Sequence, residues 1–185
     1  MKGAGSMVNV RDANAGDIDP IRAIYNEGIE DRIATLDVDA KSDAEIQEWF
    51  GAHGGRYAVL VAERSGAIVG WASLNRYSHR CAYSGVADLS VYVRRDARGT
   101  GLGTALLTAI EVRARQGGFH KIVLFALAHN SAGLRLYERL GYRAVGTFAE
   151  QGQLDGRYVD VVAMERILAP RAGPTTAGAS PPAGG

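Results

Sequence analysis

The sequence predicts an α/β protein in which helices flank a mixed β-sheet. Segments rich in β-branched and aromatic residues alternate with segments of helical periodicity, in the order β-α-α-β-β-β-α-β-α-β-β. The chain has 185 residues, of which 46% are hydrophobic, and this suffices for the core of one domain. We therefore expect a single domain over residues 8–168.

The predicted strands are short apolar runs bounded by turn residues. They cover residues 8–12, 57–63, 67–74, 89–93, 119–127, 142–150 and 157–167. The segment Arg64-Ser65-Gly66-Ala67 joins the second strand to the third and predicts a β-hairpin. Residues 75–84 form a polar, aromatic loop without periodicity, and residues 151–156 separate the last two strands.

The predicted helices are marked by residues that favour helix starts. Asp17 is a plausible N-cap, and Pro20 lies in the first turn of the first helix. Ser42 and Glu45 form a capping box for the second helix. The four helices cover residues 18–29, 43–53, 104–116 and 130–140.

Composition and charge exclude several classes of partner. The net charge of +1 argues against a nucleic acid, and no apolar run reaches the length needed to span a membrane. Cys81 is the only cysteine, which excludes an internal disulfide and a cysteine-built metal site. We expect no metal and a cytoplasmic location. The compositions of residues 1–7 and 169–185 predict a flexible N-terminus and a disordered tail.

A glycine-rich turn joins the apolar strand over residues 89–93 to the helix that follows. Its sequence is Arg98-Gly99-Thr100-Gly101-Leu102-Gly103. A helix start carries free N–H groups and the positive end of the helix dipole, and glycines let an anion approach the backbone closely. The spacing fits neither the dinucleotide fingerprint nor the nucleotide-triphosphate loop. It predicts a pyrophosphate cradle, and the alternative for this stretch alone is a turn without a ligand.

The pattern Arg98-x-x-Gly101-x-Gly103 is similar to the R/Q-x-x-G-x-G/A signature of the GCN5-related N-acetyltransferases (GNAT). The order of elements over residues 8–167 also resembles that superfamily. The resemblance implies the GNAT acyl-CoA N-acyltransferase fold, with acetyl-CoA as co-substrate and a splayed strand that binds its pantetheine arm. The acetyl-CoA contacts that it implies are Val91, Tyr92, Val93, Arg98, Gly99, Thr100, Gly101, Leu102, Gly103, Thr104 and Asn130.

A second segment, over residues 130–142, resembles the superfamily pattern N-x-x-A-x-x-L-Y-x-x-x-G-F/Y. Spacing alone favours Tyr137 as a packed core aromatic. The resemblance implies instead that Asn130 binds the CoA arm and that Tyr137 protonates the leaving thiolate. A phenol suits this role because it keeps its proton at neutral pH. Gly133 departs from the alanine of the pattern.

Three further segments resemble the phosphinothricin and arsinothricin N-acetyltransferase branch of the superfamily. They cover residues 24–35, 83–93 and 154–160. The resemblance implies direct attack in a ternary complex by the α-amino group of a small acidic amino acid or analogue, such as phosphinothricin, arsinothricin, methionine sulfone or methionine sulfoximine. It also implies resistance to such toxic analogues and a homodimer.

Asp88 stands where that branch has a glutamate that serves as general base. A partly buried carboxylate can accept a proton from an α-ammonium group, so aspartate is chemically suited. Its side chain is one methylene shorter, which calls for a bridging water or a shifted substrate. The alternative is that Asp88 only orients the strand end.

The resemblance also implies acceptor contacts from the early irregular segment and from the polar loop. They are Thr35, Arg76, Tyr77, Arg80 and Tyr83. A planar guanidinium binds carboxylate, phosphinate or arsinate well, but each loop charge could equally be a solvated surface group. Two alternatives to the amino-acid acceptor stay open. One is another amine, such as a protein N-terminus or a polyamine, and the other is an acyl-CoA-binding module with weak catalysis.

Overall fold

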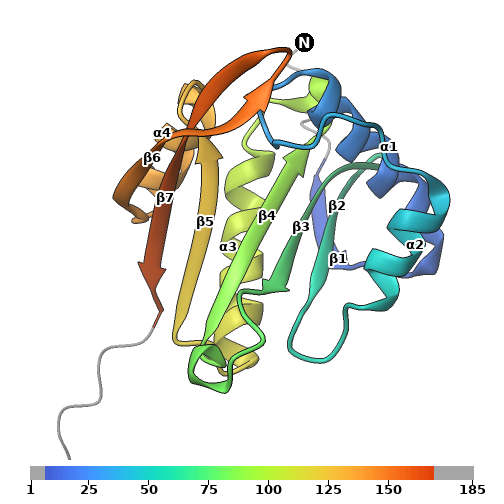
Figure 1. The fold of residues 1–185 in the computed structure, drawn as a ribbon. Coiled ribbons are helices and arrows are strands. Elements are labelled where there is room, and N and C mark those ends of the chain that lie inside the picture. Colours follow the sequence, from blue (N-terminus) through green and yellow to red (C-terminus); the bar gives the residue numbers. More distant parts are fainter. Residues whose placement is uncertain (1–6, 169–185) are drawn as a thin grey trace, which may run out of the picture.

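The computed structural model describes residues 7–168 as one seven-stranded sheet with four α-helices (Figure 1). The strands are β1 (Val8–Asp12), β2 (Val59–Arg64), β3 (Ala67–Arg76), β4 (Val86–Val93), β5 (Lys121–Leu127), β6 (Arg143–Leu154) and β7 (Arg157–Ile167). The helices are α1 (Ile18–Glu30), α2 (Asp43–Gly51), α3 (Leu102–Gln116) and α4 (Ser131–Arg139). Except for Met7, the predicted flexible N-terminus and disordered tail lie outside these residues.

The sheet has the strand order β1-β2-β3-β4-β5-β7-β6. Only β4 and β5 pair in parallel, whereas the other neighbours are antiparallel. The predicted mixed sheet and the predicted order of its elements are therefore confirmed. Within residues 7–168, no helix combines the length and apolarity that crossing a bilayer requires.

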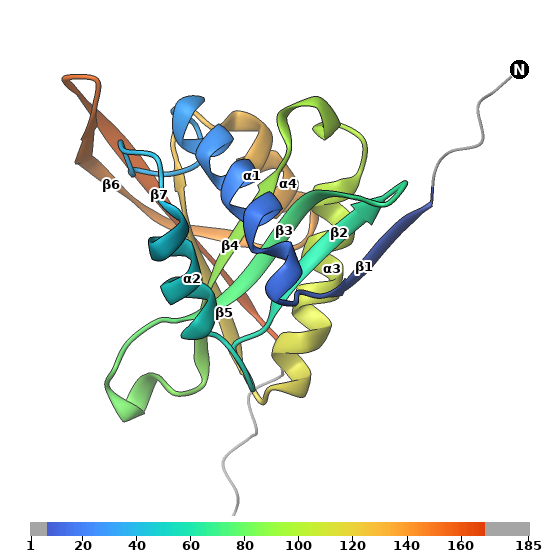
Figure 2. The same cartoon turned by 90° about the vertical axis from the view of Figure 1, so that its right-hand side faces the viewer.

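The helices cover the two faces of the sheet unequally. Helices α1 and α2 lie over β1 to β4 on one face, whereas α3 crosses the opposite face (Figures 1 and 2). Leu102, Leu106, Leu107 and Ile110 of α3 are buried at the centre of the larger core. Because α1 and α2 stop at β4, the same face of β5, β7 and β6 is left open.

Strand β6 is longer than the sequence predicts. It reaches Leu154, and the polar segment expected to separate the last two strands belongs largely to it. The hairpin closes instead at Asp155 and Gly156, whose φ angles are 47° and 77°. Two successive positive φ values are typical of the two-residue turns that join antiparallel strands. A bulge between Phe148 and Gly152 interrupts the strand, and this irregularity hides its continuity in the sequence.

Strands β4 and β5 separate in the middle of the sheet. Their pairing covers only Val86 to Asp88, and Asp88 lies opposite Val123 in the last pair. The other edge of β4 stays paired with β3 as far as Val93. The backbone of β4 beyond Asp88 therefore has no strand partner on the side that faces β5, where an extended ligand can pair with it.

Candidate active site

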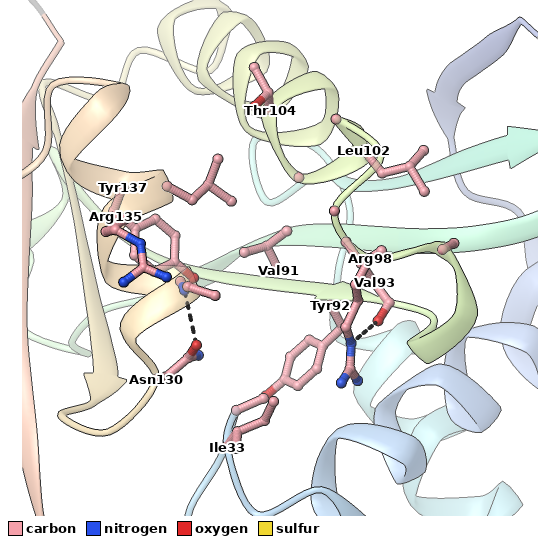
Figure 3. Close-up of a pocket in the computed structure, with 18 of the residues that line it drawn as sticks. Ile33, Val91, Tyr92, Val93, Arg98, Leu102, Thr104, Asn130, Arg135 and Tyr137 are labelled. Atoms are coloured by element: carbon pink, nitrogen blue, oxygen red, sulfur yellow. Dashed lines mark hydrogen bonds between the residues drawn. The ribbon is translucent and has the colours of Figure 1, made fainter. Parts of the chain in front are cut away.

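A cavity of about 360 Å³ lies where β4 leaves β5 (Figure 3). It is bounded by β4, the turn before α3, the first turn of α3 and one side of α4. The predicted acetyl-CoA contacts that line it are Val91, Tyr92, Val93, Arg98, Gly99, Gly101, Leu102, Gly103, Thr104 and Asn130. Tyr137 lines it as well. The structure thus gathers two sequence segments about thirty residues apart around one space.

The glycines of the turn have separate physical roles. Gly99 and Gly101 have φ angles of 73° and 89°, which side chains with a Cβ adopt only with strain. Gly103 is required by packing, because a Cβ there would lie 2.6 Å from Cδ2 of Leu136 in α4. Gly101 is also the N-cap of α3 and offers no side chain to the first amides of the helix. Those amides remain available to an anion in the cavity.

Arg98 does not act as a free cation in the turn. Its Nη1 lies 2.5 Å from Oδ2 of Asp31, and its Nε donates to the Val93 carbonyl at 3.1 Å (Figure 3). Because Asp31 neutralises the guanidinium, Arg98 mainly ties the turn to the end of α1 and to β4. The positive end of α3, rather than this side chain, supplies most of the local attraction for an anion.

Thr100 does not line the cavity, in contrast to the predicted contact. Its hydroxyl donates to the Ala97 carbonyl at 2.7 Å and accepts from Arg64 of β2 at 2.9 Å. Both hydrogen bonds fix the outer side of the turn. The Thr100 side chain therefore stabilises the turn, which its position in the motif does not predict.

Asn130 caps α4 and leaves half of its amide free. Its Oδ1 accepts from the Gly133 N–H at 2.9 Å (Figure 3). A Cβ at residue 133 would lie 2.8 Å from Nδ2 of Asn130. Glycine in place of the family's alanine therefore fits this Asn130 conformation. The Nδ2 group can donate to a ligand in the cavity, since no described residue accepts from it.

Tyr137 projects from α4 into the cavity. Its hydroxyl has no hydrogen-bond partner among residues 7–168, and its ring packs edge-on against Tyr142 at 5.9 Å between centroids. Burial raises the pKa of the Tyr137 hydroxyl to about 12. The group therefore stays protonated at neutral pH and is free to donate to a bound ligand.

Two arginines of this cavity, Arg135 and Arg139, were not predicted from the sequence. Both belong to α4 and line the cavity, and neither has an ion pair or hydrogen bond with a described residue. No carboxylate lines the same space. Their spacing of four residues places them on one face of the helix and could have indicated a shared site. The apolar stripe of the helix and Tyr137 were interpreted instead.

Asp88 lies at the point where β4 and β5 part. Burial raises the pKa of its carboxyl to about 6, while the hydrogen bonds from Asn75 and from the Leu89 amide oppose that rise. The Asn75 bond joins Nδ2 to Oδ2 of Asp88 at 3.2 Å. Below pH 6 the group is mostly protonated, and above it the group is a carboxylate that can accept a proton.

Asn75 is a third residue of the site that the sequence pattern did not indicate. It was placed at the start of the polar loop, but β3 continues to Arg76 and puts Asn75 directly opposite Asp88. Cross-strand partners share a face of the sheet, so this amide meets the carboxylate. The mixed composition of the segment obscured the end of the strand.

The predicted acceptor contacts Arg76, Tyr77, Arg80 and Tyr83 do not form one cluster. Arg76 follows Asn75 in β3 and therefore points to the opposite face, where its guanidinium lies 5.3 Å from the Tyr57 ring centroid. Tyr77 and Tyr83 touch each other at 5.4 Å between centroids in the loop before β4. Arg80 is exposed in the same loop. Among the described residues, no hydrogen bond or ion pair joins this group to Asp88.

Thr35 lies in the segment between α1 and α2 and belongs to a polar cluster there. Its Oγ1 accepts from the Asp37 N–H at 3.0 Å, and Asp37 accepts a short hydrogen bond from Tyr25. Burial is the main cause that raises the pKa of Tyr25 to about 12 and that of Tyr92 well above its usual value. Both phenols remain neutral here, with the Thr35 hydroxyl beside them.

A second cavity, of about 260 Å³, lies on the other side of β4 beneath α2. Its lining residues are Tyr25, Lys41, Glu45, Ile46, Trp49, Trp71 and Ser90. The Ser90 hydroxyl accepts from Nδ2 of Asn75 at 3.0 Å, and the same amide group holds Asp88. This aromatic cavity therefore adjoins the polar groups around Asp88.

The site, the fold and the sequence agree on the class of protein. The chain matches the acetyltransferase (GNAT) family over residues 21–142, and it belongs to this family. It is an N-acetyltransferase, as the glycine-rich turn and the segment after β5 predict. Its relatives also carry the names of the predicted branch.

Three relatives illustrate the range of the branch. The L-methionine sulfoximine/L-methionine sulfone acetyltransferase of Pseudomonas paraeruginosa is 36% identical over 164 residues, which cover 88% of this chain and 95% of the relative. The phosphinothricin acetyltransferase of Sinorhizobium meliloti, solved with acetyl-CoA, has a TM-score of 0.83 at 30% identity, covering 86% of this chain and 88% of that one. The ribosomal-protein-alanine N-acetyltransferase of Brucella melitensis has a TM-score of 0.81 at 31% identity, with coverages of 86% and 99%.

Proposed function

We propose that the protein transfers the acetyl group of acetyl-CoA to the α-amino group of a small acidic amino acid or analogue. The observation that carries this proposal is the position of Asp88. A partly buried carboxylate whose pKa is raised to about 6 stands where β4 parts from β5. It lies three residues along β4 from Val91, which lines the cavity with the bare helix amides and the free phenol. These are the parts that a direct acyl transfer requires.

The larger cavity fits acetyl-CoA. The first amides of α3 face a space in which Arg135 and Arg139 are unpaired, so a diphosphate and a further phosphate find both donors and positive charge. The free edge of β4 supplies backbone groups for the amides of the pantetheine arm. Acetyl-CoA supplies the activated acetyl group, and the protein's residues provide the proton transfers.

The mechanism uses one proton acceptor and one proton donor. Asp88 accepts a proton from the α-ammonium group, which frees the nitrogen lone pair for attack on the thioester carbonyl. An N–C bond forms and the C–S bond breaks. Tyr137 then donates its phenolic proton to the leaving sulfur. The nitrogen, which gains positive charge on attack, releases its second proton to solvent as the amide forms, and Tyr137 regains a proton from solvent. The free N–H groups of β4 near Val91 polarise the carbonyl oxygen.

The second cavity is our choice for the acceptor. Its volume suits a single amino acid, and its aromatic rings suit a short side chain. Lys41 is the cation in its lining that an acceptor carboxylate could share with Asp37 and Glu45, which lie 3.5 and 3.8 Å from its ammonium. Ser90 connects the cavity to Asp88 through Asn75. The names of the relatives support the substrate class, since they act on methionine sulfoximine, methionine sulfone and phosphinothricin. Acetylation of such analogues would confer resistance to them.

A panel of acceptors tests the function. CoA release from acetyl-CoA is measured with L-methionine sulfone, L-methionine sulfoximine, L-phosphinothricin and arsinothricin, with D-methionine sulfone as the matched control. We expect turnover of at least one L-compound and none of the D-compound. Absence of turnover with every L-compound, while acetyl-CoA still binds, would reject the acceptor class.

A protein N-terminus is the second candidate acceptor. The similarity to the Brucella melitensis ribosomal-protein-alanine N-acetyltransferase supports it. The same assay with a peptide that begins with alanine distinguishes the two. A higher kcat/KM for the peptide than for every free amino acid would favour this second candidate.

A homodimer is part of the proposal. The open face of β5, β7 and β6 carries Phe125, Phe148 and Ile167, each about half exposed, and the two phenylalanine rings lie 6.4 Å apart. An exposed aromatic and aliphatic sheet face of this kind is typical of a protein interface. A second copy of the chain would cover it beside the Asp88 end of β4.

A further inference from the structure

A polar cluster lies behind Asp88 on the α2 face of the sheet, and Asn75 is at its centre. Nδ2 of Asn75 donates to Asp88 at 3.2 Å and to the Ser90 hydroxyl at 3.0 Å. Oδ1 of Asn75 accepts from the Ser73 hydroxyl at 2.9 Å. The register explains the cluster, because Ser73 lies opposite Ser90 and Asn75 lies opposite Asp88. One amide therefore joins three polar side chains on two strands.

His53 completes this cluster from the end of α2. Its Nε2 lies 3.0 Å from Oδ1 of Asn75, and its Nδ1 lies 2.7 Å from the carbonyl oxygen of Trp49 one helical turn earlier. The Trp49 ring packs against the His53 ring at 4.5 Å between centroids. The imidazole is thus fixed at both nitrogens and on one side.

Both partners of the His53 ring are acceptors in this arrangement. The Trp49 carbonyl oxygen accepts only, and so does Oδ1 of Asn75. A neutral imidazole carries one N–H and can satisfy one of them, whereas an imidazolium satisfies both. Reversal of the Asn75 amide would suit a neutral His53, but it would turn an oxygen toward Asp88. Asp88 would then have to be protonated, and a protonated carboxyl cannot act as a base.

We propose that His53 is a positioning residue for the base: its doubly protonated ring fixes the Asn75 amide so that the amide nitrogen faces the Asp88 carboxylate. This rests on the proposed role of Asp88 in the reaction. His53 does not touch the substrate. It acts through one side-chain amide, and the positive charge on the ring further favours the ionised form of Asp88.

The other titratable groups around Asp88 are engaged elsewhere. On α1, Tyr25 is bonded to Asp37, and on α2, Glu45 caps Ser42. On β5, Lys121 is paired with Glu165 of β7.

The strands next to Asp88 add no free charge on its face. On β3, Arg76 lies over Tyr57 on the opposite face, and on β4 itself the buried Tyr92 stays neutral. Lys41 lies between Asp37 and Glu45, at 3.5 and 3.8 Å. His53 is therefore the titratable group that the Asn75 amide connects directly to Asp88.

Nuclear magnetic resonance of the full chain tests the proposal without turnover. Carboxyl-labelled aspartate reports the titration of Asp88, and ring-labelled histidine reports how many hydrogens His53 carries. We expect His53→Leu to raise the Asp88 midpoint by about half to one pH unit, since an opposing charge and a fixed donor are lost. His53→Gln keeps a donor for Asn75 without the charge and should give a smaller shift. His120→Gln, at an exposed ring without a side-chain contact, is the control.

The outcomes separate this proposal from the proposed function. An unchanged Asp88 midpoint in both His53 variants, or a singly protonated His53 ring beside an ionised Asp88, would overturn the role of His53. If the midpoint moves but no acceptor is acetylated, the proposed function fails and the positioning role stands. If acetylation occurs, His53→Leu should lower kcat/KM several-fold at pH 6 and much less at pH 8, with KM for acetyl-CoA unchanged.

Discussion

The environment of Asp88 lowers the stability of the fold but suits the side chain to act as a base. Its burial makes the ionised form costly, and the same burial brings its pKa to about 6, where a general base works well near neutral pH. The hydrogen bond from the Asn75 amide stabilises the ionised form in part, but the pKa stays raised. A carboxylate retained in such a place is typical of a functional site.

Replacement of Asp88 by asparagine should therefore stabilise the fold at alkaline pH. The folded pKa of about 6 exceeds the ordinary value of 3.8, so the wild-type protein loses stability as pH rises through 6. Asp88→Asn lacks this loss and should be more stable at pH 8 by on the order of 2–3 kcal/mol. The difference should vanish near pH 4. Thermal denaturation at both pH values measures it.

Asp39→Asn is the matched control for this stability measurement, because Asp39 is exposed and has no ion pair among the described residues. Its stability difference from the wild type should not change with pH. If Asp88→Asn behaves in the same way as this control, the carboxyl of Asp88 is not the perturbed group that the site requires.

At single residues, the sequence predicted positions within one segment but not contacts between distant segments. Motif spacing predicted Tyr137 and Asn130 as neighbours of the cofactor, and both line the larger cavity, where their roles stay predictions. Asn75 and His53 were missed, since their use depends on the β3–β4 register and on where α2 ends. Thr100 and Arg98 were both predicted to contact the cofactor. Arg98 lines the cavity but its guanidinium pairs with Asp31, whereas the Thr100 hydroxyl accepts from Arg64 outside the lining. Tertiary partners of this kind leave no local pattern.

At the scale of elements, the contact between α3 and α4 shapes the larger cavity. Gly103 in the first turn of α3 packs directly on Leu136 of α4. The two helices approach closely only because residue 103 has no Cβ. The position of Tyr137, the next residue after Leu136, depends on this contact.

Substitution of Gly103 by alanine should weaken acetyl-CoA binding. The added Cβ would lie 2.6 Å from Cδ2 of Leu136, so the Leu136 side chain, which lines the same cavity, must shift. We expect a loss of about tenfold in affinity, in line with the roughly 1–3 kcal/mol that overpacking costs. Isothermal titration calorimetry with acetyl-CoA measures this loss.

A second-site variant makes the packing argument specific. Leu136→Ala removes the atoms that collide with the new Cβ, so the double variant should recover part of the affinity that Gly103→Ala loses. Gly146→Ala, at a position with nothing within 4 Å, should bind as the wild type does. Equal losses for the single and double variants would show that the Gly103–Leu136 contact is not the cause.

Periodicity predicted the elements well because most of them have one buried face. Helix α3 and most of strand β5 bury one face, whereas β2 and β3 are buried on both faces and appear as continuous apolar runs. Strand β6 is almost fully exposed along its length, and its pattern therefore carried little information about where it ends. The Asp155-Gly156 turn was the stronger signal for that boundary.

At the scale of the whole molecule, the uneven helix cover has a consequence for assembly. The half of the sheet next to α1 and α2 is closed, whereas the face of β5, β7 and β6 is open (Figure 1). Phe125 and Phe148 lie on this open face. The resemblance implied a dimer, but the sequence could not say which surface forms it.

Charge placed on the open face should therefore disrupt the proposed dimer. Phe148→Arg is expected to convert a particle of twice the chain mass into a monomer, because an interface cannot bury an unpaired guanidinium cheaply. Light scattering after size exclusion measures the mass. Val112→Arg, at an exposed position on α3, should leave the dimer intact. A wild-type protein that is monomeric at high concentration would refute the dimer.

The most direct test of the whole account is the pH dependence of acetyl transfer to L-methionine sulfone, for the wild-type protein and Asp88→Asn, at saturating acetyl-CoA. The account predicts that the wild-type rate falls as pH drops through about 6, and that Asp88→Asn loses about a hundredfold or more in rate together with this inflection. A variant that retains the wild-type rate and the wild-type profile would contradict it.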